Sequence, residues 1–201
     1  MGRGHGGSRG GSAGGGISDR TMQGYSSTLA KAMKEREESI RGNNDFETGF
    51  VFDEHGNMTF TVKGNRDHIE FDRGTTTNKI LTHNHPAYYD EKGRVVAGNS
   101  LSDRDVIAAV IDNPREVRVI SGNYRFSMKR TQADWGTKES KIRAKVAGAR
   151  RAITGSLQKY IDNYKGDKTT ALARAQQVEW HLFNKRMSQT LGYSYTKQRI
   201  N

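Results

Sequence analysis

The segment Thr82-His83-Asn84-His85-Pro86 constrains the fold of this chain more than any other part of the sequence. The residues before it, from Lys79 to Thr82, favour a β-strand, and Pro86 ends that strand because proline has no N–H for the ladder. Residues two apart on an extended strand lie on the same face, so the imidazoles of His83 and His85 can reach one ion. The segment predicts a strand near 79–84 that carries a pair of metal ligands at its end.

A second motif, Ser102-Asp103-Arg104-Asp105, follows downstream at the start of a predicted helix. Ser102 in this position is typical of an N-cap, and an acidic residue in the first helical turn needs no metal to explain it. Asp105, one turn into the helix, can nevertheless also face an ion. Two imidazoles, one carboxylate and a water form an open tetrahedral zinc site. We therefore predict Zn²⁺ as the cofactor, with His83, His85 and Asp105 as its ligands.

The order H-x-H-P, then S-x-x-D, with a glutamate on an earlier strand, resembles the JAMM (MPN-plus) metallopeptidases. The resemblance covers about Asp45 to Trp135, and the wording THNHP is closest to family members from phages and mobile elements. It implies a mixed-sheet α/β fold and zinc-dependent hydrolysis of an amide bond, with a glutamate as proton acceptor and a serine that donates to the oxyanion. Glu47 and Ser102 match these two catalytic positions. Glu54 is the alternative glutamate, but a hairpin turn would place it at the solvated end of the strand.

The chain departs from the family pattern in two places. Asn84 stands where serine or threonine is usual, a mild change because its side chain points away from the ion. Fifteen residues separate Pro86 from Ser102, about twice the usual spacing, and they predict a polar loop beside the site. Such a loop could carry specificity or could block the cleft.

Composition restricts the class of protein and its organisation. The absence of cysteine excludes disulfides and cysteine-ligated zinc, and no apolar run reaches the roughly 20 residues of a membrane span. We expect no membrane partner. The expected location is the cytoplasm of the host cell or, if the protein is encoded by a phage, the virion. The net charge of +11 is uneven, because residues 136–201 carry +10. That stretch predicts contact with an anionic partner, either nucleic acid or an acidic protein.

The chain divides into four predicted parts. Residues 1–18 are a Gly-rich, disordered tether, and residues 19–44 hold a helix, from Thr28 to Arg41, that packs along the edge of the core. Residues 45–135 form the JAMM-like domain, and residues 136–201 form a basic helical hairpin with an amphipathic stripe and a second helix near 168–190. The predicted domain contains one clear helix near 103–112 and strands near 48–53, 58–63, 68–71, 79–84, 116–121 and 124–129.

Three functions are compatible with these patterns. The first is a zinc peptidase or isopeptidase acting on a protein or peptide, which in a phage would serve processing or head morphogenesis. The second is a catalytically inactive zinc-binding adaptor that works through its basic tail. The third is an HNH nuclease, which fits poorly because the only histidine after the motif is His181.

Overall fold

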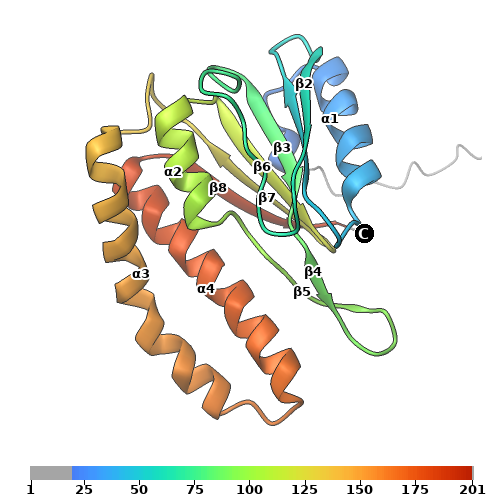
Figure 1. The fold of residues 1–201 in the computed structure, drawn as a ribbon, viewed down its shortest axis with the longest axis vertical. Coiled ribbons are helices and arrows are strands. Elements are labelled where there is room, and N and C mark those ends of the chain that lie inside the picture. The colour runs from blue at the N-terminus through green and yellow to red at the C-terminus, as the bar shows by residue number, and fades with distance from the viewer. Residues whose placement is uncertain (1–19, 201) are drawn as a thin grey trace, which may run out of the picture.

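A mixed six-stranded sheet forms the centre of the computed structural model, which describes residues 20–200 (Figure 1). Only β3 and β6 run parallel, and every other neighbouring pair is antiparallel. The strands lie in the order β2 (Met58–Lys63), β1 (Thr48–Phe52), β3 (Ile80–Asn84), β6 (Glu116–Ser121), β7 (Tyr124–Lys129) and β8 (Ser194–Arg199). The predicted α/β class with a mixed sheet is confirmed. The predicted disorder of residues 1–18 lies outside the described residues.

Five of the six predicted strands are present, but the strand expected near 68–71 is wrong. The side chain of Asn65 accepts hydrogen bonds from the backbone N–H groups of Asp67 and His68, at 2.8 and 3.0 Å. This local turn competes with strand pairing, so the chain leaves the sheet after β2 and continues as an irregular segment to β3. That segment becomes one wall of a cleft described below.

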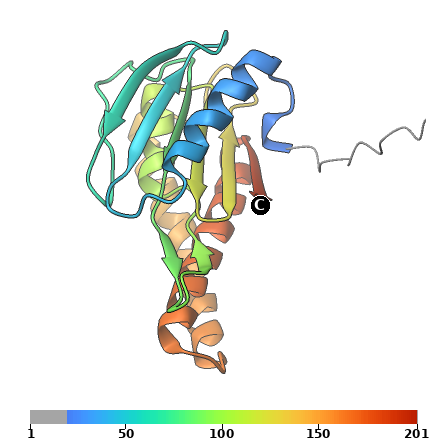
Figure 2. The same cartoon turned by 90° about the vertical axis from the view of Figure 1, so that its right-hand side faces the viewer.

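The helices lie on both faces of the sheet (Figure 2). Helix α1 (Ser27–Ile40) covers one face, and α2 (Asp103–Asp112), α3 (Glu139–Asp162) and α4 (Lys168–Leu191) lie on the other. The prediction that the first helix packs along an edge is wrong, because Leu29, Met33 and Ile40 of α1 are buried against strand residues of the sheet face.

A buried charge network accounts for the low apolar content of α1. Glu37 of α1 is fully buried and accepts hydrogen bonds from Arg118 at 2.7 Å, from Thr82 at 3.0 Å and from Arg125. Arg118 also donates to Glu116 at 2.7 Å. Burial alone would raise the pKa of Glu37, but the two arginines hold it below its usual value. A paired charge thus fills one position on this helix, Glu37, that the sequence pattern alone would assign to solvent.

The C-terminal residues are part of the same core as the sheet. Ile142, Val146, Ala149 and Ile153 of α3 belong to one buried cluster with strand residues such as Val119. The two predicted tail helices are present, but sequence analysis missed β8, which pairs with β7 along its whole length. The expected stripe on α3 faces inward, toward the core.

The insertion between Pro86 and Ser102 is a hairpin where sequence analysis expected a loop. Its strands are β4 (Ala87–Tyr89) and β5 (Val95–Gly98), paired antiparallel. The hydroxyl of Tyr88 donates to Gln176 of α4 at 2.6 Å, so the hairpin leans on that helix. Tyr88 is therefore a packing residue of the hairpin.

Within residues 20–200, no helix combines the length and apolar character required to cross a membrane.

Candidate metal centre

Strand β3 presents the two histidines toward α2. Side chains alternate along a strand, so His83 and His85 share the α2 face while Thr82 and Asn84 point toward the α1 face. The Nε2 atoms of the two histidines lie 3.0 Å apart. Both imidazoles are buried, His83 completely. The sequence-predicted pair is therefore brought together at one point.

A backbone acceptor orients His85. Its Nδ1 lies 3.0 Å from the carbonyl oxygen of Ser100, so Nδ1 carries the proton and Nε2 keeps its lone pair for the site. Ser100 is held in turn by α4 and β8, because its hydroxyl is 2.8 Å from the Tyr195 hydroxyl and Asn184 donates to the adjacent Leu101 carbonyl at 2.7 Å. Nδ1 of His83 is buried and has no hydrogen-bond partner among the described residues, so no second-nitrogen contact like that of His85 orients this ring.

Asp105 enters the site from the first turn of α2 and also completes a capping box. Its Oδ2 accepts from the Ser102 N–H at 2.6 Å and from the Ser102 hydroxyl at 2.8 Å. Its Oδ1 lies 3.2 Å from His83 Nε2, and Oδ2 lies 3.4 Å from His85 Nε2. Asp105 therefore both caps the helix and places its carboxylate next to the two histidines.

Glu47 comes from the position directly before β1. It is buried, and its Oε1 lies 3.8 Å from His85 Nε2. Glu47, His83 and His85 each offer a ligand atom within 4.8 Å of the other two, so this buried group could hold a metal ion. Glu54, in contrast, is exposed in the turn between β1 and β2, and among residues 20–200 it pairs only with His55.

Hydrogen bonds on both sides of Glu47 fix its backbone. The Asn84 amide accepts from the Thr48 N–H at 2.7 Å and donates to the carbonyls of Phe46 and Asn43, each at 3.0 Å. The Glu47 N–H donates to Asn65 at 2.7 Å. Asn84 therefore ties the strand that carries the histidines to the peptide groups flanking Glu47.

The two carboxylates have opposite electrostatic surroundings. Burial raises the pKa of Glu47 above its usual value, although His85 and His83 oppose the rise. Burial would also raise the pKa of Asp105, but His83 and His85 hold it well below its usual range. Burial alone would lower the pKa of His85, but Asp105 and Glu47 raise it. Asp105 thus stays ionised as a ligand should, while Glu47 takes up a proton more readily, a division seen in acid–base sites.

The donor atoms of these residues lie about as far apart as neighbouring ligands of one tetrahedral metal ion. Bonds of about 2.0 Å from zinc to nitrogen or oxygen imply about 3.3 Å between neighbouring donor atoms. His83 Nε2 lies 3.0 Å from His85 Nε2 and 3.2 Å from Asp105 Oδ1, and His85 Nε2 lies 3.4 Å from the other carboxylate oxygen of Asp105, Oδ2. Glu47, at 3.8 Å from His85, stands outside this spacing. The three predicted ligands therefore meet at one point, next to Glu47, which with the two histidines forms a buried group that could hold a metal ion.

A cleft of about 640 Å³ opens onto the site and is lined by Glu47, His85, Ser102 and Asp105. Leu81 of β3 and Val117 of β6 lie at its base, the segment 67–76 forms one wall, and α2 forms the other. None of residues 87–101 lines this cleft. The insertion therefore leaves the site open.

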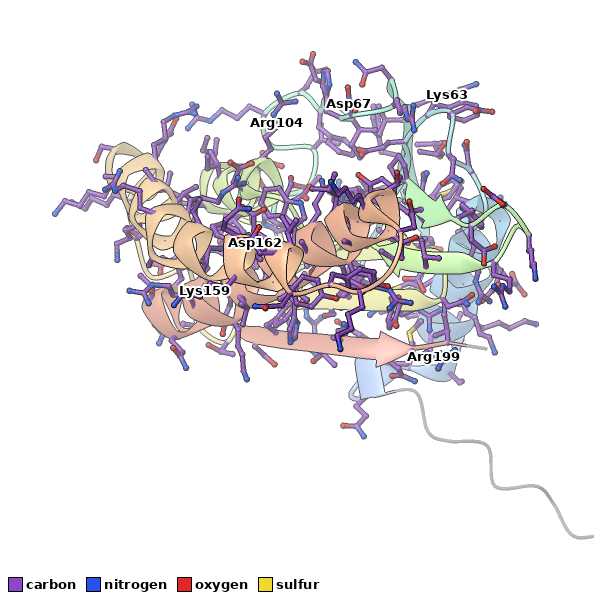
Figure 3. The ribbon with its side chains drawn as sticks, turned by 90° about the horizontal axis from the view of Figure 1, so that it is seen from below. Lys63, Asp67, Arg104, Lys159, Asp162 and Arg199 are labelled. Carbon is purple, nitrogen blue, oxygen red and sulfur yellow. The ribbon has the colours of Figure 1, made fainter. Side chains whose placement is uncertain are left out.

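Two opposite charges stand at the edges of the cleft. Arg104 of α2 and Asp67 of the opposite wall both line it, and Figure 3 shows them on the same edge of the molecule. Both are exposed, and the Arg104 guanidinium has no ion-pair partner among the described residues. A substrate with a charge of its own would be oriented by this pair.

Three features of the site were missed by sequence analysis. Ser100 orients His85 through its backbone carbonyl, and a backbone group is present whatever the side chain, so the sequence gives no sign of this role. Arg104 lies within the motif but has no distinctive spacing. Asn84 carried a signal, because an amide replaces the usual serine or threonine, and an amide can donate two hydrogen bonds and accept one, whereas a hydroxyl has a single proton to donate.

Comparison with family models, with curated proteins and with solved structures finds no match for this chain.

Proposed function

We propose that this chain is a zinc-dependent hydrolase of the JAMM type that cleaves an amide bond in a protein or peptide. The observation that carries the proposal is the convergence of four side chains: the Nε2 atoms of His83 and His85 lie 3.0 Å apart, the two oxygens of Asp105 lie 3.2 and 3.4 Å from them, and the buried Glu47 lies 3.8 Å from His85. Zinc held by His83, His85 and Asp105 would polarise the scissile carbonyl and acidify the attacking water.

Glu47 is suited to move the proton in this reaction. As the water oxygen bonds to the carbonyl carbon, Glu47 accepts a proton from that water, and it then delivers the proton to the amine as the C–N bond breaks. Its raised pKa favours the first transfer, because a carboxylate that binds a proton too weakly cannot take one from water.

Ser102 is suited to stabilise the oxyanion that forms on the carbonyl. Its hydroxyl lies at the cleft and donates to Asp105, so the hydroxyl has to rotate away from this carboxylate to reach a substrate. The Ser102 N–H keeps its own hydrogen bond to Asp105 at 2.6 Å, so the ligand stays held while the hydroxyl turns. Loss of one such donor typically lowers the rate by about 10²–10³-fold.

The open cleft favours an enzyme over an inactive adaptor. A long insertion next to the site suggested obstruction, but the β4–β5 hairpin leans on α4 and lines no part of the cleft. The nuclease alternative has no further support, because His181 lies beside Tyr195, whose hydroxyl is 3.1 Å from its Nδ1.

Elemental analysis tests the metal assignment. Purified wild type should hold about one zinc per chain, His83→Ala and Asp105→Ala should lose it, and His55→Ala should keep it because His55 is exposed in a turn. If wild type prepared without chelators contains no zinc, the metal assignment is wrong, and the motif is only a capped helix next to two histidines on a strand.

A hydrolysis assay then tests the role of Glu47. Glu47→Gln should bind zinc as wild type does and lose about 10²–10⁴-fold in turnover on a quenched peptide library. If this variant instead loses its zinc, Glu47 is a ligand. If wild type is loaded with zinc and inert toward every peptide, the chain is an adaptor.

A further inference from the structure

The outer face of α3 carries positive charge that the protein does not neutralise. Among the Lys and Arg residues of this helix, Arg150 alone forms ion pairs with described residues, with Glu179 at 3.0 Å and Asp103 at 3.8 Å. The two acidic residues of α3 are engaged, Glu139 by Arg73 and Asp162 by Gln158. The remaining cations are Lys141, Arg143, Lys145, Arg151 and Lys159.

The packing of α3 fixes the orientation of these cations. Ile142, Val146, Ala149 and Ile153 are buried in the core, so the rotation of the helix about its axis is set. Of the five cations, four are exposed and Lys145 is half-buried. Figure 3 shows Lys159 on α3, in a different part of the molecule from Arg104 at the cleft. None of the five cations lines the cleft, and Lys159, near the C-terminal end of α3, lies away from it.

Small residues separate the cations along the helix. Ala144, Ala147 and Ala152 are exposed, and a Cβ added at Gly148 would meet nothing within 4 Å. The helix has 24 residues and is about 36 Å long at about 1.5 Å per residue. The outer surface of α3 is therefore long, and the side chains that project farthest from it are mainly cationic.

The chemistry of this surface favours a nucleic acid over a protein. Protein interfaces depend on a few large apolar or aromatic anchors. The exposed large apolar side chains of the described residues all lie outside α3: Met58, Phe60, Tyr89, Leu172 and Val178. A phosphate backbone needs no such anchor, and a duplex offers about one negative charge per 1.7 Å of its axis.

We propose that the outer face of α3 binds the phosphate backbone of a duplex nucleic acid, without reading its sequence. This site is independent of the proposed hydrolysis. It would hold the chain on a nucleic acid, or on a complex that contains one, while the cleft remains accessible.

Fluorescence anisotropy with the full chain tests this proposal, using a 20-base-pair duplex DNA (about two helical turns) and a duplex RNA of equal length, at several salt concentrations. Five phosphate contacts predict a slope of about −4.5 for log K against log salt, which is a loss of about 500-fold between 50 and 200 mM. The variant K141Q/R143Q/K145Q/R151Q/K159Q should lose most of this binding to both duplexes and still bind zinc.

A control variant of equal net charge separates a local surface from total charge. K31Q/K34Q/K63Q/R66Q/K92Q changes five exposed cations outside α3 and should keep wild-type affinity. Absence of binding by wild type, or equal losses in both variants, would overturn the proposal. A wild type that binds a polyglutamate peptide and neither duplex would assign the face to an acidic protein instead.

Discussion

Replacing Asn84 by alanine should lower the free energy of unfolding of the protein and leave the predicted metal ligands in place. The side chain is fully buried and makes three hydrogen bonds to backbone groups of residues 43–48. Those groups are half-buried, so each lost bond costs about 1 kcal/mol, the ordinary net value, and the sum is about 3 kcal/mol. For a chain of this size, that corresponds to a fall in Tm of about 6–12 °C.

Urea and thermal unfolding of the metal-free proteins measure this effect. Asn84→Asp is the sharper variant, because it keeps an acceptor for the Thr48 N–H but sets a carboxylate oxygen against the carbonyls of Asn43 and Phe46. It should be at least as unstable as Asn84→Ala. Asn163→Ala is the control, since that side chain is exposed and its loss should stay within about 0.5 kcal/mol.

Zinc stoichiometry distinguishes a local effect on Glu47 from general damage to the site. Asn84 points away from the histidines, so Asn84→Ala should still bind zinc at room temperature, while hydrolysis falls because Glu47 is no longer held. If Asn84→Ala and Asn163→Ala unfold at the same urea concentration, Asn84 does not tie the strand to Glu47, and the reasoning fails.

Three further predictions concern acid, metal and substrate charge. The pKa of Glu37 in the folded protein is below the ordinary 4.5. The stability that ionised Glu37 contributes is therefore complete above pH 4.5 and is lost as the pH falls through the lower folded-state pKa. The urea midpoint of metal-free protein should accordingly fall more steeply with acid in wild type than in Glu37→Gln. Free zinc at 100 times its Kd should add about 2.7 kcal/mol to the unfolding free energy of wild type and nothing to that of His83→Ala, as measured by thermal melts; an equal gain in both would place the metal elsewhere. If the proposed hydrolysis holds, Arg104→Glu should shift the preference from acidic toward basic peptides by at most about fivefold in kcat/KM, because an exposed ion pair contributes about 1 kcal/mol or less. An unchanged preference would remove Arg104 from substrate recognition.

The sequence was most informative where side-chain chemistry and local geometry agree. The alternation of β3 placed His83 and His85 on one face, and the Ser102 cap placed Asp105 one turn into α2, so the structure brings together residues chosen from short-range patterns. The end of α2 also follows local chemistry, because Asn113 closes this helix in the left-handed conformation, which asparagine adopts more readily than most residues.

Features that depend on long-range pairing were not predictable. Glu37 reads as one more charge on a polar helix, and only its distant partners Arg118 and Arg125 explain its burial. Strand β8 is mixed and mostly polar, and it is a strand because β7 offers it an edge. The segment near 68–71 has the composition of a strand but no partner in the sheet, since the Asn65 turn directs it away.

The support that α4 and β8 give to Ser100 has a consequence for the order of events during synthesis. Both histidines and Asp105 leave the ribosome long before Asn184 and Tyr195, which hold the segment that orients His85. A partly made chain therefore contains every predicted ligand but lacks the groups that fix one of them. For a hydrolase of proteins, this sequence of events would withhold activity until translation has passed β8, when the new chain is folded and less open to its own attack.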